Sequence, residues 1–108
     1  MTFDQLQDKI KAWGKSKGIT NKKKQKGKRT IQRYAQTIKV QEETGELCGA
    51  ILREDQPKIM DGIGDSIVTL ILLAEIEGYT LEDCLLIAWN EIKSRDGKMV
   101  NGSFIKNN

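Results

Sequence analysis

Histidine is absent from this chain of 108 residues, and only two cysteines are present. The lack of histidine excludes the commonest general base and every zinc site that depends on imidazole. It also leaves a cysteine nucleophile without its usual basic partner. We therefore expect Cys48 and Cys84 to be small buried thiols in a reducing compartment.

Proline, aromatic residues and long apolar runs are also scarce. Pro57 is the single proline, so long helices are permitted, and aromatic residues make up only 6% of the chain. β-branched residues do not alternate over any length, which disfavours strands. The longest apolar run, residues 67–74, is far shorter than the roughly 20 residues that cross a membrane. The first ten residues, MTFDQLQDKI, are polar and acidic, unlike a secretion signal. We expect a cytoplasmic protein without membrane contact.

Apolar residues at helical spacing are present instead, in four segments. They predict helices over about 4–17, 30–53, 57–77 and 80–94. Thr30 and Thr80 are suited to cap the second and fourth helices, and Pro57 fits the first turn of the third. Residues 21–29, NKKKQKGKR, are expected to be a solvated basic loop. The sequence thus predicts a single all-α domain over residues 1–108, with four antiparallel helices.

The third predicted helix is apolar on nearly all faces from Ile67 to Ala74, apart from Thr69. A helix that is apolar all round must be covered all round. A monomer of this length can hardly supply that cover, so we expect a homo-oligomer. The residues after the fourth helix, SRDGKMVNGSFIKNN, are expected to form a loop and tail.

Charge is divided unevenly along the chain. Residues 1–40 hold twelve Lys and Arg against two Asp, a net +10, whereas residues 41–108 hold six against thirteen acids, a net −7. This division suits an anionic ligand held through a bridging cation. An alternative is a helical protein that binds nucleic acid weakly through the basic run at 21–29. No aromatic residue interleaves that run, and no recognition helix follows it.

Five acids stand beside the most hydrophobic segment. Glu42, Glu43 and Glu46 are spaced to share one helix face, as are Asp61 and Asp65 in the next helix. The short connector makes these helices antiparallel neighbours, so the acids should converge. Burial of an unpaired charge costs several kcal/mol, and oxygen-only ligands favour Mg²⁺ or Mn²⁺. We predict that Glu43, Glu46, Asp61 and Asp65 bind this metal. The alternative is a solvated acidic face.

Glycines accompany these acids, although glycine inside a helix costs about 1 kcal/mol against alanine. Such glycines indicate close approach of helices or room for a ligand. They are Gly45, Gly49, Gly62 and Gly64.

The same acids resemble the motifs of MazG-like nucleoside triphosphate pyrophosphohydrolases, an all-α family. Glu42-Glu43-Thr44-Gly45-Glu46 has the family's form EExxE, and Asp65 matches the last residue of the ExxD motif on the next helix. The glutamate expected three residues before Asp65 is replaced by Gly62. Asp61 is the nearest acid that could substitute for it.

The resemblance extends to most of the chain outside 21–29. It includes Trp13 in the first helix and AQTIKVQEETGEL, with Gln36 and Lys39. The closing segment AWNEIKSRDGKMVNGSFIK is similar to that of short, single-domain members. Its polar residues of interest are Asn90, Lys93, Arg95 and Lys98.

The resemblance implies hydrolysis of (deoxy)nucleoside triphosphates to the monophosphate and pyrophosphate. It also implies a homodimer or homotetramer in which helices from more than one chain build each site. Glu42, Glu43, Glu46 and Asp65 would be the catalytic residues, with Glu42 as a further Mg²⁺ ligand or as the base that orients the attacking water. The departure at Gly62 leaves a second possibility, a nucleotide-binding protein with weakened catalysis.

Other residues are expected to bind the substrate. Lys39, Lys93, Arg95 and Lys98 would contact phosphate oxygens, Asn90 the sugar or base, and Trp13 would stack on the base. Each has a structural alternative. The three C-terminal cations suit a helix C-terminus, Trp13 suits a core, and Lys39 is spaced to pair with Glu43.

Overall fold

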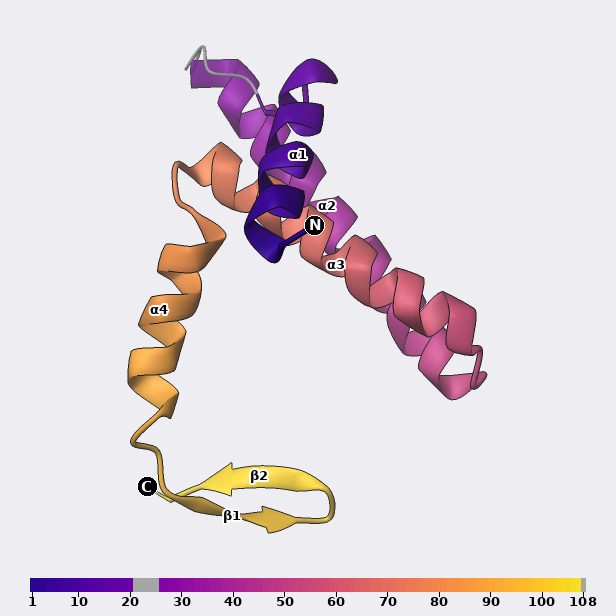
Figure 1. The fold of residues 1–108 in the computed structure, drawn as a ribbon, viewed down its shortest axis with the longest axis vertical. Helices are drawn as coiled ribbons and strands as arrows, with labels where there is room; N and C mark the ends of the chain where they lie inside the picture. Colours follow the sequence, from indigo (N-terminus) through magenta and orange to yellow (C-terminus); the bar gives the residue numbers. More distant parts are fainter. Residues whose placement is uncertain (21–25, 108) are drawn as a thin grey trace.

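The computed structural model describes residues 1–20 and 26–107, of which 26–30 are described in backbone only. The described chain forms four helices and a two-stranded hairpin (Figure 1). In chain order these are α1 (Phe3–Ser16), α2 (Lys26–Leu52), α3 (Gln56–Glu77), α4 (Leu81–Ile92), β1 (Gly97–Val100) and β2 (Ser103–Lys106).

Local sequence signals set most helix ends. Thr2 caps α1 in a reciprocal capping box with Gln5. Asp55 caps α3 by accepting a hydrogen bond from the Lys58 amide, and Pro57 occupies the first turn. Gly78 ends α3 in the left-handed conformation, with φ of 83°. The predicted cap of α4 is confirmed, because the Thr80 hydroxyl accepts from the Asp83 amide at 3.0 Å.

The prediction of an all-α domain with four helices is confirmed, but the start of the second helix was placed wrongly. α2 begins at Lys26, so Thr30 lies inside the helix and is not its cap. Of the predicted basic loop, residues 26–29 are helical, and 21–25 lie outside the described residues. Lysine and arginine are good helix formers, which explains why the basic run continues the helix.

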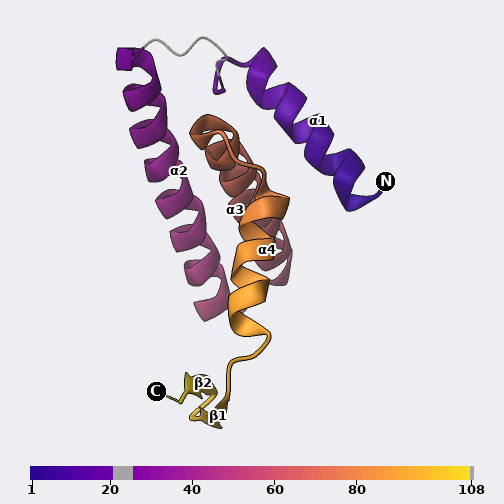
Figure 2. The same cartoon turned by 90° about the vertical axis from the view of Figure 1, so that its left-hand side faces the viewer.

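The packed body consists of α1, α2 and α3. α2 and α3 run antiparallel and side by side along their length, and α1 lies against α3 (Figures 1 and 2). Gly62 and Gly14 allow close approach, Gly62 to Leu47 of α2 and Gly14 to Leu72 of α3. The fully enclosed core is small. Its apolar members are Ala50, Ile71, Leu72 and Ala74.

The C-terminal arm, residues 81–107, departs from this body (Figures 1 and 2). α4 touches only α3, and among the described residues the hairpin packs against no other element. Leu85 and Trp89 of α4 are each 56% exposed. Although four helices were predicted correctly, the fourth therefore does not complete a bundle within the described part of one chain.

The predicted loop and tail after α4 is wrong, because β1 and β2 pair antiparallel with Val100 opposite Ser103. Asn101 and Gly102 form the two-residue connection, with φ of 50° and 82°. This dipeptide is the strongest short-range hairpin signal, since both positions need positive φ. The signal was present in the sequence.

Two further expectations concern cysteines and membranes. Cys48 and Cys84 are free but exposed, so the prediction of buried thiols is wrong. Cys84 is exposed because α4 is uncovered. Among the helices of the described residues, none is both long enough and apolar enough to cross a bilayer.

Candidate active site

A cavity of about 580 Å³ lies between α1, α2 and α3. Its α2 wall is a stripe of side chains that recurs every three or four residues, with two adjacent pairs, and lies along one side of the helix. The stripe consists of Ile31, Gln32, Ala35, Gln36, Lys39 and Glu43. Facing residues come from α3 and from α1 with the loop that follows it. They are Asp65, Val68, Thr69, Leu72, Trp13, Gly18 and Ile19.

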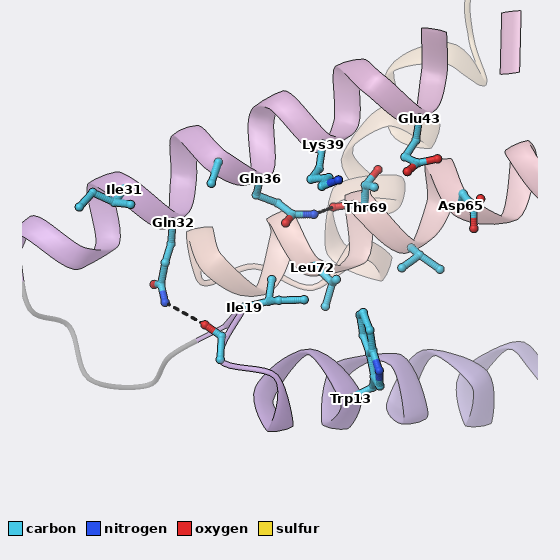
Figure 3. Close-up of a pocket in the computed structure, with 13 residues that line it drawn as sticks. Trp13, Ile19, Ile31, Gln32, Gln36, Lys39, Glu43, Asp65, Thr69 and Leu72 are labelled. Atoms are coloured by element: carbon cyan, nitrogen blue, oxygen red, sulfur yellow. Dashed lines mark hydrogen bonds between the residues drawn. The ribbon is translucent and has the colours of Figure 1, made fainter. Parts of the chain in front are cut away.

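The cavity is polar at one end and mainly apolar elsewhere. Glu43 and Asp65 face each other across α2 and α3 at one end, Ile31 lies at the other, and Ile19 and Leu72 lie between them (Figure 3). Trp13 stands on α1, opposite the α2–α3 wall, and is 48% exposed. Such a combination of apolar surface and a few convergent polar groups is typical of small-molecule sites, which usually measure about 300–1,000 Å³.

The polar end concentrates negative charge. The pKa of the Glu43 carboxyl is raised above its ordinary value, first by partial burial and then by the charges of Glu46 and Asp65. The two acidic helices thus converge as predicted, with three carboxylates close enough to interact. The positive charge of Lys39 lowers the pKa of Glu43, but it offsets only part of the rise.

Lys39 makes its direct contact elsewhere. Its ammonium donates to the Glu42 carboxylate at 3.1 Å, so it pairs with Glu42 rather than with Glu43, the partner suggested by spacing. That hydrogen bond and the charge of Glu42 raise the pKa of Lys39, with smaller contributions from Glu43 and Glu46. Lys39 therefore stays cationic beside the acids.

The predicted metal ligands are only partly gathered. Within the described ranges, no three Cys, Asp or Glu side chains are grouped tightly enough to enclose a cation as they stand. Asp61 is exposed and lines a second groove of about 570 Å³ between α1 and α3, which Asp65 also borders. Nevertheless, the donor set fits Mg²⁺ or Mn²⁺ chemically. It offers only oxygen, and the crowding around Glu43 is of the kind that a divalent cation relieves.

Gly62 has a structural reason to differ from the family motif. It is buried, and a Cβ at this position would lie 3.2 Å from the Leu47 Cβ and 3.3 Å from its Cα. A glutamate would have to push the backbones of α2 and α3 apart. Close packing of α2 against α3 therefore explains why glycine, and not the glutamate of the family motif, occupies position 62.

The remaining predicted substrate-binding residues do not line the cavity. Asn90 lies in α4 and Lys93, Arg95 and Lys98 follow, all exposed on the C-terminal arm. Lys93 donates to the Asn90 side chain at 3.1 Å, and Arg95 lies 3.6 Å from Glu91. Within one chain the structure brings together Trp13, Lys39, Glu43 and Asp65, but not these four.

Among the lining residues, the sequence did not single out Gln32 as a site residue, and Gln36 was named only through the family resemblance. Gln36 and Gln32 stand about two and three turns before Glu43 on the same stripe, and Thr69 and Leu72 continue the Asp65 face. The helical spacing from Glu43 back to Gln32 was a usable signal. It was overlooked because these residues lack charge.

Comparison with known families identifies the family of this chain. The family model described as the MazG nucleotide pyrophosphohydrolase domain matches residues 29–100. The chain belongs to this family. The match confirms the resemblance and covers α2, α3, α4 and β1, including all the acids of the site. α1, which carries the Trp13 wall of this MazG domain, precedes the matched region. Searches of curated proteins and of solved structures find no match.

Proposed function

We propose that this MazG protein hydrolyses (deoxy)nucleoside triphosphates to the monophosphate and pyrophosphate with the help of Mg²⁺. One observation carries the proposal. The cavity joins a largely apolar space of nucleoside size to the carboxylates Glu43 and Asp65, and the charge of nearby Glu46 acts on Glu43 as well. The base and sugar would occupy the apolar part, and the triphosphate would extend to the acids. A cytoplasmic location belongs to this proposal, because the substrates occur there.

Glu43, Glu46 and Asp65 would hold Mg²⁺, or Mn²⁺ in its place, and Asp61 is a candidate fourth ligand. When bound, the ion would supply charge neutralisation and electrophilic assistance at the phosphate. Glu42 is proposed either as a further ligand or as the base that orients the attacking water. Lys39, a cation at neutral pH that pairs with Glu42, would attract the phosphate oxygens. The exposed ring of Trp13 is available to stack on the base.

We further propose that the protein acts as a homodimer or homotetramer. α4 carries Leu85, Leu86, Ile87, Trp89 and Ile92 at half exposure or more, which is costly to leave in water. Packing of this arm against a second copy would cover these side chains. It would also carry Asn90, Lys93, Arg95 and Lys98 towards a site on the neighbouring chain.

The test is an assay of pyrophosphate release from a panel of NTPs and dNTPs, with Mg²⁺ and with a chelator. Wild type should release pyrophosphate only with the cation, and Glu43→Gln should lose at least about a hundredfold in kcat. Glu54→Gln is the matched control, because Glu54 lies in the α2–α3 connection and lines none of the cavities described. Absence of pyrophosphate above background for every nucleotide would refute the enzymatic proposal.

A second candidate, a nucleotide-binding protein with weakened catalysis, is favoured by Gly62. Its close contact with Leu47 removes one acid of the family motif. Nucleotide binding measured by calorimetry, without turnover, would support this candidate. The nucleic-acid alternative depends on residues 21–29, which fall largely outside the described residues. It predicts binding that persists in EDTA and weakens steeply with salt.

A further inference from the structure

We infer that Gln36 recognises the nucleobase by accepting a hydrogen bond from one of its N–H groups. This inference rests on the proposed function, which places a nucleotide in the cavity. Gln36 is only 6% exposed and lines the middle of the α2 wall. The side chain as a whole is buried, but its Oε1 atom is not among the enclosed polar atoms without a partner and is therefore open to the cavity, where a ligand can donate to it.

The orientation of the Gln36 amide is fixed by α3. Its Nε2 atom donates to the backbone carbonyl oxygen of Thr69 at 2.9 Å, in a buried contact. A carbonyl can only accept, so the nitrogen must face Thr69 and the amide cannot flip without losing this bond. The Oε1 atom consequently faces the cavity (Figure 3), and no described residue donates to it.

The position along α2 suits a base. Gln36 precedes Glu43 by seven residues, which is roughly 10 Å along a helix that rises about 1.5 Å per residue. A nucleotide whose phosphates reach the acids would therefore present its base near Gln36. The surroundings agree, since Leu72 and Trp13 border this part of the cavity (Figure 3). Gln32, one turn earlier, bonds to the Gly18 carbonyl at 3.5 Å and joins α2 to the loop after α1 at the cavity's end.

Because the direction of the Gln36 Oε1 atom is fixed and this atom can only accept, the base that binds here must present an N–H donor to it. The exocyclic amines of adenine, cytosine and guanine, and the ring N–H of guanine, uracil and thymine, can all satisfy Oε1. A base whose nitrogen has lost every N–H cannot, which requires two methyl groups on an exocyclic amine or one on a ring nitrogen, and its binding would leave Oε1 without a partner. A neutral hydrogen bond contributes about 0.5–1.5 kcal/mol, so we expect up to about tenfold discrimination against the methylated base.

The experiment measures binding of nucleoside 5′-monophosphates by calorimetry in EDTA, so that neither hydrolysis nor a cation is needed. Each parent, AMP, CMP, GMP and UMP, is compared with counterparts in which one donor nitrogen has no N–H left, that is, a dimethylated exocyclic amine or a methylated ring nitrogen. Wild type should bind at least one parent about three- to tenfold more tightly than one of its counterparts. Gln36→Met, which keeps the length of the side chain but removes the acceptor, should reduce that ratio to about one. Gln41→Met, an exposed glutamine on the same helix, is the matched control and should retain the wild-type ratio.

The ratio separates recognition from a purely structural role. If Gln36 only braces α2 against Thr69, Gln36→Met will weaken parent and methylated ligands equally, and the preserved ratio would overturn the inference. Absence of any preference in wild type would overturn it as well. The triphosphate assay is independent. Failure to release pyrophosphate would refute the proposed hydrolysis, while the metal-free binding ratio would still decide the role of Gln36.

Discussion

Replacing Gly62 and Gly64 separately by alanine tests how closely α2 and α3 pack. The two glycines are two residues apart in α3 but have different surroundings. A Cβ on Gly62 would meet both the Cβ and the backbone Cα of Leu47 at 3.2 and 3.3 Å, whereas a Cβ on Gly64 would meet nothing within 4 Å. Because a backbone atom cannot rotate away, α2 and α3 would have to separate slightly at Gly62.

The magnitudes follow from two opposing effects. Alanine gains about 0.8–1.0 kcal/mol over glycine inside a helix, and Gly64→Ala should show this gain. In Gly62→Ala the same gain is opposed by overpacking, which typically costs about 1–3 kcal/mol. We therefore expect Gly62→Ala to be less stable than Gly64→Ala by about 1–3 kcal/mol. For a domain of this size, each kcal/mol corresponds to about 4–8 °C in Tm.

The assay is urea unfolding followed by circular dichroism, with all proteins at one chain concentration. Equal slopes against urea are required before the free energies are compared. If the two variants agree within about 0.5 kcal/mol, the close packing at Gly62 is refuted. Gly62→Glu, which restores the family's acid, should be less stable still and should not gain activity, because its carboxylate lies where the helices meet.

Four further predictions concern the acidic end of the cavity and the arm. EDTA should abolish pyrophosphate release and added Mg²⁺ should restore it, and activity that survives the chelator would contradict a metal-dependent reaction. Asp65→Asn should lose much more kcat than Asp61→Asn, because Asp65 interacts with Glu43 whereas Asp61 does not contribute to its pKa shift; equal losses would show that Asp61 is a full ligand. Without divalent cations, Glu43→Gln should raise the unfolding free energy at pH 7. That gain should disappear as the pH falls below the ordinary value of 4.5, where the carboxyl is protonated in both states; the check is chemical unfolding across a pH series. Finally, Glu43→Gln and Lys93→Ala should each be inactive alone but regain part of the wild-type rate when mixed and re-annealed, because one mixed site would be intact. Absence of recovery in verified mixed oligomers would contradict a site shared between chains.

Much of the fold follows from local signals. Apolar spacing predicted all four helices, and Thr80 and Pro57 marked helix starts that the structure retains. The hairpin was missed although its signal, Asn101-Gly102, was explicit. The departure of α4 was not predictable from its own sequence, because an apolar helix face indicates burial without indicating which chain provides the cover.

The acidic end of the cavity was likewise accessible from the sequence. Equal spacing on two antiparallel helices brought Glu43 and Asp65 together as predicted. By contrast, the orientation of Gln36 depends on the Thr69 carbonyl, 33 residues further along the chain. A contact of this separation leaves no local pattern. The sequence predicts close helix approach or ligand space for four glycines together, and only the proximity of Leu47 shows that Gly62 is the one among them that meets the facing helix.

The uncovered C-terminal arm also affects how thermal unfolding of this protein will behave. Four apolar side chains of the described residues are fully enclosed within one chain, so in the proposed oligomer much of the remaining apolar burial would come from neighbouring chains. Folding and assembly then become one equilibrium, governed by mass action. Its melting temperature should climb as the chain concentration rises, and simple dilution should act on it as a mild denaturant.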